Sequence, residues 1–276
     1  MHPPRPPAGD EPLPAPLIVH YHIFKNAGTS VDEALHRCFG PAWRTFEGAH
    51  AHDVKTADEV RAFLAANPGV RALSTHLGRP PLPHARSYPI VFLRHPILRA
   101  RSVFEFLRRD PSRPGPKDSL PAFVEWALDS PDGAVIRDYQ VVHLSSASFT
   151  RPSILQARAD ERHLEEAKEL LGDWGMVGIV EEYERSLERF QRRYGSQVPG
   201  LQLRPYWMNS TTSIGPRPMQ ARLEEIRTLL GETLLSALTQ ANRLDLALYT
   251  YARRLAANAD DLSIEALRPA AAPVRV

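Results

Sequence analysis

Hydrophobic and polar positions along the chain predict a regular succession of strands and helices. Residues 17–23 (LIVHYHI) are apolar, β-branched or aromatic, as in a buried strand. Residues 29–39 then place Val31, Leu35 and Cys38 at the spacing of one helix face. The first predicted unit is therefore a strand, a tight turn and a helix.

The same alternation continues along most of the chain. Residues 88–94 (YPIVFLR) are nearly continuous in apolar residues, as expected of a central parallel strand covered on both faces, and Pro96 suits the first turn of a helix. Further strands are predicted at 70–75 and 174–180, and further helices at 56–66, 119–128, 133–143, 160–171 and from 181 onward. Strands that alternate with helices predict an α/β fold, a three-layer α/β/α arrangement around a central parallel sheet, with a helical C-terminal third.

The two ends of the chain differ from the part between them. Residues 1–16 (MHPPRPPAGDEPLPAP) are rich in proline and lack the apolar core of a secretion signal, so we expect a disordered tail. Residues 268–276 are expected to be a flexible tail as well. With 276 residues and 43% hydrophobic content, the chain can bury a large core, and we predict a single domain at 17–267. Two long irregular stretches, at 110–118 and 204–218, are candidates for functional loops.

Charge and cysteine content narrow the classes of function. The 34 basic residues are balanced by 32 acidic ones, so a broadly basic nucleic-acid-binding surface is not expected. No stretch approaches the roughly 18 apolar residues that a membrane-spanning helix needs. The single cysteine, Cys38, cannot form an internal disulfide, which indicates a reducing compartment. We therefore expect a cytoplasmic protein without nucleic-acid or membrane partners.

A lysine, one of only four in the chain, stands at the corner between the first strand and the first helix, in the stretch KNAGTS. Such a turn leaves backbone N–H groups unpaired in front of the positive end of the helix dipole, and this attracts phosphate or sulfate. Lys25 can add an ammonium charge, Thr29 and Ser30 hydroxyl donors, and Gly28 a close approach of the backbone. The spacing is not the G-x-x-x-x-G-K-[ST] of nucleotide hydrolases. An ordinary structural turn is the alternative.

A second candidate for phosphate binding is the stretch YPIVFLRHPILRARSVF at 88–104. Arg94 ends the predicted central strand, at the edge where open α/β sheets bind their ligands, and Ser102 follows eight residues later in the predicted helix. An arginine fork and a serine hydroxyl could both reach one phosphate. Arg99 and Arg101, in contrast, are expected to be ordinary surface charges.

Together, HIFKNAGTS at 22–30 and FLRHPILRARSVF at 92–104 resemble the two cofactor signatures of sulfotransferases that use 3′-phosphoadenosine 5′-phosphosulfate (PAPS). The most similar branch is that of carbohydrate sulfotransferases, including the heparan sulfate 2-O-sulfotransferase type. VGIVEEYERSLERF at 177–190 is similar to a strand and helix of that family, whereas Phe24 and His95 depart from its frequent proline and aspartate. The resemblance implies a P-loop-like sulfotransferase fold that binds PAPS. It also implies that the 5′-phosphosulfate loop comprises Lys25, Asn26, Ala27, Gly28, Thr29 and Ser30, and that Arg94 and Ser102 hold the 3′-phosphate.

Sulfuryl transfer needs charge stabilisation at the leaving phosphate and a base for the acceptor hydroxyl, and no metal is implied. Lys25 is expected to neutralise the charge that grows on the bridging oxygen. His76 is the expected base, because it follows the predicted strand at 70–75, can titrate near neutral pH, and is similar in position to a recurrent base of the family. The alternatives are His50, His52, Glu47, His20 and His22, of which the last two are expected to be buried within the strand.

The expected function is therefore transfer of a sulfuryl group from PAPS to a hydroxyl of a sugar or small metabolite. The alternatives are a P-loop nucleotide kinase, which the missing Walker spacing disfavours, and an inactive nucleotide-binding adaptor. His50, His52 and Asp53 are residue types that bind metals. Alternating histidines on an extended segment point to opposite faces, so no metal site is expected at these residues. Trp43 and Trp207 could stack on an acceptor or belong to the core. The sequence leaves the acceptor and the oligomeric state open.

Overall fold

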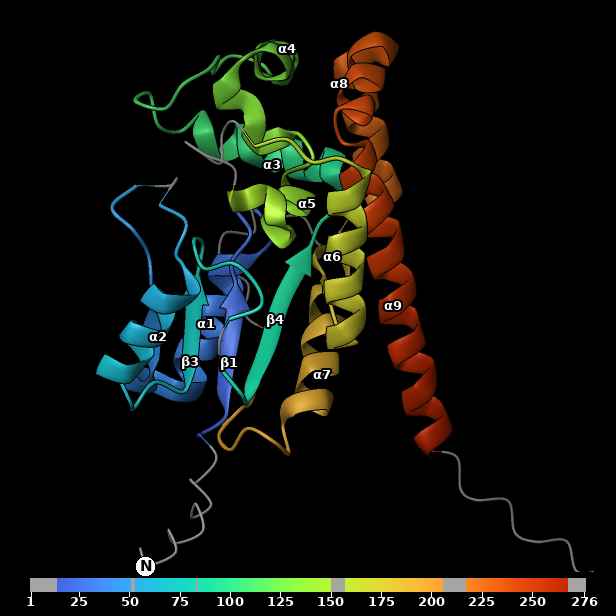
Figure 1. Ribbon diagram of the computed structural model, residues 1–276. Coiled ribbons are helices and arrows are strands. Elements are labelled where there is room, and N and C mark those ends of the chain that lie inside the picture. Colours follow the sequence, from blue (N-terminus) through green and yellow to red (C-terminus); the bar gives the residue numbers. More distant parts are fainter. Residues whose placement is uncertain (1–13, 51–52, 83, 150–156, 206–216, 268–276) are drawn as a thin grey trace, which may run out of the picture.

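The computed structural model describes residues 14–50, 53–82, 84–149, 157–205 and 217–267. At its centre is a five-stranded parallel sheet with the order β2-β3-β1-β4-β5. The middle strand, β1 (Leu17–Tyr21), lies between β3 (Ala72–Thr75) and β4 (Ser87–Leu93), and the short strands β2 (Trp43–Thr45) and β5 (Gly178–Ile179) form the edges (Figure 1). The predicted α/β class with a parallel sheet is confirmed.

Helices cover both faces of this sheet. They are α1 (Gly28–Phe39), α2 (Ala57–Ala66), α3 (Pro96–Leu107), α4 (Leu120–Asp129), α5 (Tyr139–Leu144), α6 (Glu161–Trp174), α7 (Tyr183–Tyr194), α8 (Met219–Gln240) and α9 (Arg243–Leu267). Short 3-10 helices lie at 40–42, 131–136, 146–149 and 180–182. The helical C-terminal third is thus confirmed by α8 and α9. Within the described residues, no helix combines the length and apolar character that crossing a membrane requires.

Alternation of side chains along β1 explains the layers. Leu17, Val19 and Tyr21 face one side, where they pack with residues of α2, α5, α6 and α9. Ile18 faces the other side and packs with α1 and α7. A further apolar cluster joins α3, α4 and α8 beyond the carboxyl end of the sheet, where Figure 1 shows α3 and α4 above the arrowhead of β4. The sheet therefore has a covered face on each side and a helical cap over its carboxyl edge.

Several predicted boundaries differ from the observed ones. The predicted strand at 174–180 is paired only over Gly178–Ile179, and the predicted helix at 133–143 is divided by Asp138, which has φ 41° and separates a 3-10 helix from α5. Strand β2 was not predicted, because it has only three residues and two of them are exposed. Residues 1–13, 206–216 and 268–276, and with them Trp207, lie outside the described residues.

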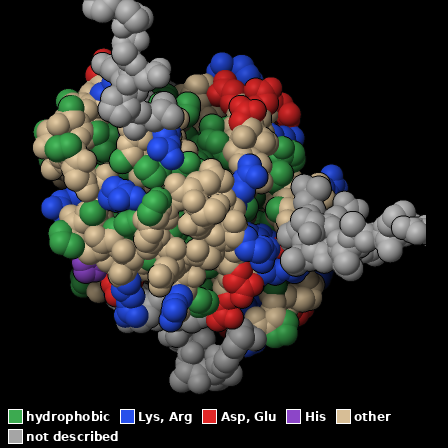
Figure 2. Space-filling view, turned by 90° about the horizontal axis from the view of Figure 1, so that it is seen from below, with side chains coloured by type: hydrophobic (Ala, Val, Ile, Leu, Met, Phe, Trp, Pro, Cys, Tyr) green, Lys and Arg blue, Asp and Glu red, His purple; other side chains and the backbone are tan. Residues whose placement is uncertain are grey.

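The charged side chains on the face opposite to the helical cap are mixed. Figure 2, which looks at the molecule from below, shows basic and acidic side chains interspersed among apolar ones. This agrees with the near balance of 34 basic and 32 acidic residues. Both signs of charge are thus present on this face.

Candidate functional site

The carboxyl ends of the three central strands bring together the segments that the sequence singled out. The turn after β1 contains Lys25, the residue after β3 is His76, and the residue after β4 is Arg94. Because β1 pairs in parallel with both β3 and β4, these three positions lie at one edge of the sheet. Arg94 Nη1 donates a hydrogen bond to the carbonyl oxygen of Lys25 at 3.1 Å, so the two predicted phosphate motifs are in contact.

The turn between β1 and α1 has an unusual backbone. Lys25 has φ 66° and Ala27 has φ 64°, both in the left-handed region. For residues with a side chain this conformation costs about 1–2 kcal/mol each, and such strain is concentrated at functional sites. Ala27 is also the N-cap of α1, and no side chain caps this helix. The first N–H groups of α1 therefore meet no capping side chain, which is the arrangement that binds anions at helix N-termini.

Packing against a neighbouring side chain requires glycine at position 28, and the sequence did not show this. A Cβ atom at this position would lie 1.9 Å from Cδ2 and Nε2 of His22. The imidazole of His22 therefore lies directly against the backbone at the start of α1. The sequence assigned Gly28 to the approach of a bound anion, and the structure adds the approach of a histidine ring from inside the protein.

Two other members of the predicted loop hold the turn in place. Asn26 is buried, and its Nδ2 donates to the carbonyl oxygen of Phe92 at 2.7 Å and to Oε1 of Gln140 at 2.8 Å. Ser30 is also buried, and its side chain is a hydrogen-bond partner of the Tyr183 phenol. Thr29 is exposed, and Ala27 is half-buried. A cofactor contact stays a prediction for all four residues, Asn26, Ala27, Thr29 and Ser30. Asn26 and Ser30 have buried side chains, which hold the turn through contacts inside the protein.

Lys25 is a half-buried cation beside aromatic rings. Its Nζ lies 4.6 Å from the ring centroid of Phe106 and 5.8 Å from that of Phe24. Within the described residues it forms no ion pair with a carboxylate. Burial, followed by the charges of Arg94 and Arg109, lowers the pKa of Lys25 below its usual value. The rings stabilise the ammonium group without neutralising it.

Arg94 is held by its backbone and by one contact of its side chain. Its backbone N donates to Oε1 of Gln140 at 2.9 Å, and Nε2 of Gln140 donates to its carbonyl oxygen at 3.0 Å. Its Nε atom is buried without a partner among the described residues. Burial lowers the pKa of Arg94 to about 10, so that the guanidinium stays charged at neutral pH. Ser102 is half-buried on α3, and no hydrogen bond joins it to Arg94 within the described part of the chain.

The prediction that Arg99 is a surface charge was wrong. Its side chain is only 1% exposed, because α3 lies under the segment that carries Val135 and Tyr139. Nε donates to the carbonyl oxygen of Phe24 at 3.1 Å, Nη1 donates to that of Val135 at 2.7 Å, and the guanidinium lies 4.5 Å from the ring centroid of Tyr139. Arg99 therefore holds the turn after β1 through the carbonyl group of Phe24. Arg101, in contrast, forms a half-exposed ion pair with Glu225 at 2.6 Å.

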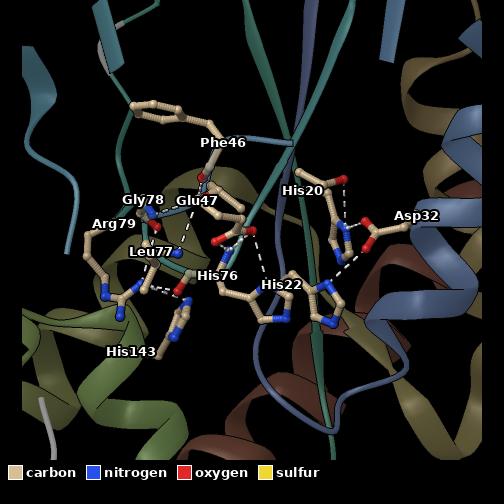
Figure 3. A network of polar contacts seen from close by, with 12 residues as sticks. His20, His22, Asp32, Phe46, Glu47, His76, Leu77, Gly78, Arg79 and His143 are labelled. Atoms are coloured by element: carbon tan, nitrogen blue, oxygen red, sulfur yellow. Dashed lines mark hydrogen bonds and ion pairs between the residues drawn. The ribbon is translucent and has the colours of Figure 1, made fainter. Parts of the chain in front are cut away.

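His76 forms a pair with Glu47, which the sequence gave as a rival base (Figure 3). The Nδ1 atom of His76 lies 3.0 Å from Glu47 Oε1, and its backbone N donates to the same oxygen at 2.9 Å. The imidazole ring of His76 also stacks on the ring of His22, with 3.7 Å between the two centroids. A carboxylate at Nδ1 fixes the proton there and leaves Nε2 free to accept one. Because 42% of the side chain is exposed, an acceptor can reach it.

Sequence reasoning missed two residues behind His76. Arg79 is 4% exposed, and its Nη1 donates to the carbonyl oxygen of His76 at 2.6 Å (Figure 3). The same Nη1 lies 3.5 Å from Nε2 of His143, which is buried on α5. Burial lowers the pKa of Arg79 to about 10 and that of His143 well below its usual value. The spacing His-x-x-Arg, from His76 to Arg79, was the only signal in the sequence. The contact between Arg79 and His143 is visible only in the fold.

His20 and His22 are buried, as predicted, but only His20 lies within the strand, because β1 ends at Tyr21. Both histidines contact Asp32 of α1. Nδ1 of His20 lies 2.7 Å from Oδ1 of Asp32, and Nδ1 of His22 lies 2.9 Å from Oδ2. Burial above all lowers the pKa of His22 to about 4. Burial alone would raise the pKa of Asp32, but the two histidines hold it well below its usual range. Neither histidine is placed as an exposed base.

The remaining candidates contribute less to this edge. The backbone N of exposed His50 donates to Oδ2 of Asp53 at 2.9 Å, and His52 lies outside the described residues. Trp43 is half-buried, and its Nε1 donates to the hydroxyl of Ser74 at 3.0 Å, which ties β2 to β3. A role of Trp43 in acceptor binding stays a prediction.

Comparison with known proteins gives one distant relative of unknown role. No family model matches the chain. A protein of Archaeoglobus fulgidus, described as an uncharacterized protein, is 26% identical over an alignment of 246 residues that covers 84% of this chain and 94% of that protein. The similarity covers most of both chains, so the relative is similar over nearly its full length.

Proposed function

We propose that the protein is a sulfotransferase that moves a sulfuryl group from PAPS to a hydroxyl of a carbohydrate or small metabolite. The observation that carries the proposal is the hydrogen bond from Arg94 to the carbonyl oxygen of Lys25. It brings two cations together at the carboxyl edge of the sheet, and within the described residues neither forms an ion pair. A bound group with separate 5′ and 3′ anions would supply the missing negative charge.

The residues present fit such a group. The uncapped start of α1 and Lys25 offer donors for a 5′-phosphosulfate, and the unpartnered Nε of Arg94 offers one for a 3′-phosphate. PAPS, when bound, supplies the sulfuryl group. The strained backbone at Lys25 and Ala27 fixes the donors before binding, so that little reorganisation is needed during the reaction.

His76 and Glu47 are the proposed proton-accepting pair. Glu47 orients the ring and holds the proton on Nδ1, and Nε2 accepts the proton of the acceptor hydroxyl. The hydroxyl oxygen forms a bond to sulfur while the bond from sulfur to the phosphate oxygen breaks. Lys25 stabilises the negative charge that this oxygen gains. The acceptor proton thus ends on His76 and the charge beside Lys25.

The first test is a calorimetric titration of the purified protein with 3′-phosphoadenosine 5′-phosphate (PAP), adenosine 5′-monophosphate and ATP. We expect a Kd for PAP on the order of micromolar, with weaker binding of both other nucleotides, because only PAP engages the 3′-phosphate donors. Arg94→Ala should remove the preference for the 3′-phosphate. Arg227→Ala, which removes an exposed arginine bonded to Glu232, is the matched control. Equal or tighter binding of ATP, or no binding by the folded protein, would overturn the proposal.

The second test follows transfer from labelled PAPS to a panel of sugar and phenol acceptors. We expect His76→Ala to lower kcat by about 10²–10⁴ while PAP affinity is kept, and Glu47→Gln to lower it less. His36→Ala, a change outside the sheet edge, is the control. Tight PAP binding without transfer to any acceptor would favour the inactive adaptor, and turnover that needs ATP and magnesium would favour the kinase.

A further inference from the structure

A second cluster of polar side chains lies under the start of α1, on the face of β1 opposite to Tyr21. His20 and His22 are two residues apart on an extended segment, so they point to the same face, which α1 covers. Asp32, in the second turn of α1, points back at both rings (Figure 3). One ligand atom from each of the three residues lies within 4.8 Å of the others. The sequence placed both histidines in the strand but did not connect them with Asp32.

The distances in this cluster are those of hydrogen bonds, and they are near the separation of neighbouring ligands around a metal ion. Zinc binds nitrogen and oxygen ligands at about 2.0–2.2 Å, which places neighbouring ligands roughly 3 Å from one another. The two nitrogen–oxygen distances, from His20 and His22 to Asp32, are 2.7 Å and 2.9 Å. An ion could enter once the side chains move so that one ligand atom of each residue reaches it, starting from a spread of 4.8 Å or less. The ion would replace the Nδ1 protons, and each imidazole would then carry its proton on Nε2.

The charge of the cluster also suits a cation. Among the described residues, the carboxylate of Asp32 forms ion pairs only with the two imidazoles, and its side chain is 19% exposed. Both rings bind this carboxylate through Nδ1, so its negative charge lies at the centre of the cluster. The remaining exposure leaves part of the carboxylate open to solvent. Behind His20, the hydroxyl of Ser74 lies 3.3 Å from Nδ1 and supports the ring.

We propose that His20, His22 and Asp32 bind one divalent transition-metal ion, with zinc or iron(II) as the fitting chemistry, and that this ion fastens α1 to β1. Two imidazoles and one carboxylate are the ligands that these metals prefer, and three protein ligands leave a position for water. The ion would bind the first residue of the turn at 22–27, His22, whose ring stacks on that of His76. Its role is to fix the helix whose N-terminus forms the candidate anion site.

The test uses the full chain after chelator treatment, titrated with Zn²⁺ by calorimetry and with Co²⁺ by visible absorption. We expect one equivalent to bind and Co²⁺ to show ligand-field bands. Asp32→Asn and His20→Gln should weaken binding by more than the roughly 10- to 100-fold that loss of outer ligand partners costs. His50→Ala is the matched control and should bind as the wild type, because His50 belongs to the other histidine segment.

The opposite results would overturn the proposal: no bound metal in the folded wild type, or binding that survives Asp32→Asn and is lost in His50→Ala. If the variants do not fold, amide hydrogen exchange of the wild type decides. Added Zn²⁺ should slow exchange in 17–39, whereas unchanged or uniformly changed exchange would exclude the site. These readouts need no PAPS, so they are independent of the sulfotransferase proposal.

Discussion

Arg94 is half-buried and Arg189 is buried, and the protein treats the charges of these two arginines in opposite ways. Arg189, on α7, is 2% exposed; its Nε donates to Asp260 at 2.9 Å, and its Nη2 donates to Asp260 at 2.6 Å and to Glu182 at 3.0 Å. Arg94 contacts only the carbonyl oxygen of Lys25 through its side chain, within the described residues. The first guanidinium forms ion pairs with two carboxylates, whereas the second forms none within the described residues, and the carboxylate of Glu181 acts on it only from a greater distance.

The pKa shifts follow this difference. Burial alone would lower the pKa of Arg189, but the hydrogen bonds to Asp260 and Glu182 raise it above its usual value. For Arg94, burial dominates and lowers the pKa to about 10. Removing one partner of a buried ion pair leaves the other charge unpaired and destabilises the fold, whereas a half-buried charge without a paired carboxylate is available to a ligand that brings negative charge. The comparison therefore separates a structural arginine from a binding one.

The largest expected effect is the loss of folding stability when Arg189 is replaced. Arg189→Met should lower the free energy of unfolding by about 3 kcal/mol, near the lower end of the range for breaking a buried ion pair, since Arg185 and Arg192 also contact Asp260 at 2.7 Å and 3.3 Å. Urea unfolding followed by circular dichroism measures it. Arg227→Met, at an exposed pair, should change the free energy of unfolding by less than about 0.5 kcal/mol. Equal effects of both variants would refute the distinction.

The next effect is on binding. Arg94→Met should weaken PAP binding by about 1.5–3 kcal/mol, the usual contribution of a hydrogen bond to a charged group, and should change the free energy of unfolding by less than about 1 kcal/mol. Calorimetry and urea unfolding of the same preparation measure the two quantities. A loss of stability as large as that of Arg189→Met, with unchanged PAP affinity, would make Arg94 a structural arginine too.

The fold could be predicted further than the site. Apolar stretches that alternate with helical periodicity are local, so β1, β4 and most helices follow from the sequence. The partners of buried polar groups are not local. Asn26 contacts Gln140, 114 residues away, and Arg99 contacts Val135, 36 residues away. No periodicity shows which segment covers a side chain, and this is why Arg99 was assigned to the surface.

Within the site, residue type predicted location but not conformation. Lysine before a Gly-Thr-Ser sequence pointed to the turn, and Arg94 at the end of a strand pointed to the same edge. Left-handed backbone is usually marked by glycine, yet it occurs here at Lys25 and Ala27, while Gly28 is helical. The pair of His76 with Glu47 depended on β2 and β3 lying side by side, and β2 itself was not predicted.

Asp138 is a negatively charged counterpart of Arg94, because it is a partly buried group without a close ion pair among the described residues. Burial, and then the charge of Asp245, raises the pKa of Asp138 to about 7, against 3.8 as its ordinary value. The folded protein thus binds a proton that the unfolded chain releases, so stability falls as pH rises from about 4 to 7 and is level above that. Asp138→Asn should remove this loss and raise the free energy of unfolding at pH ~8 by about 1–2 kcal/mol.

The amide oxygen of asparagine can still accept the backbone N–H groups of Leu244 and Asp245, which Asp138 Oδ1 accepts at 2.9 Å each. Urea unfolding at pH ~4.5 and ~8 measures the difference between the variant and the wild type. Asp58→Asn, at an exposed helix position, should leave the pH dependence as it is. An unchanged slope in Asp138→Asn would mean that this carboxyl is not the unpaired charge that the comparison requires.

The smallest effect concerns the strained turn beside Arg94. Ala27→Gly should raise the free energy of unfolding by about 0.5–1 kcal/mol, because φ 64° is unfavourable for alanine and not for glycine. Ala62→Gly, in an exposed interior position of α2, should lower it by about 1 kcal/mol. The gain should come with weaker PAP binding, since a more flexible turn no longer holds its donors in place before the ligand arrives. If Ala27→Gly gains stability and binds PAP as the wild type does, the strain serves packing around His22, and only the unpaired charge distinguishes this edge from the Arg189 cluster.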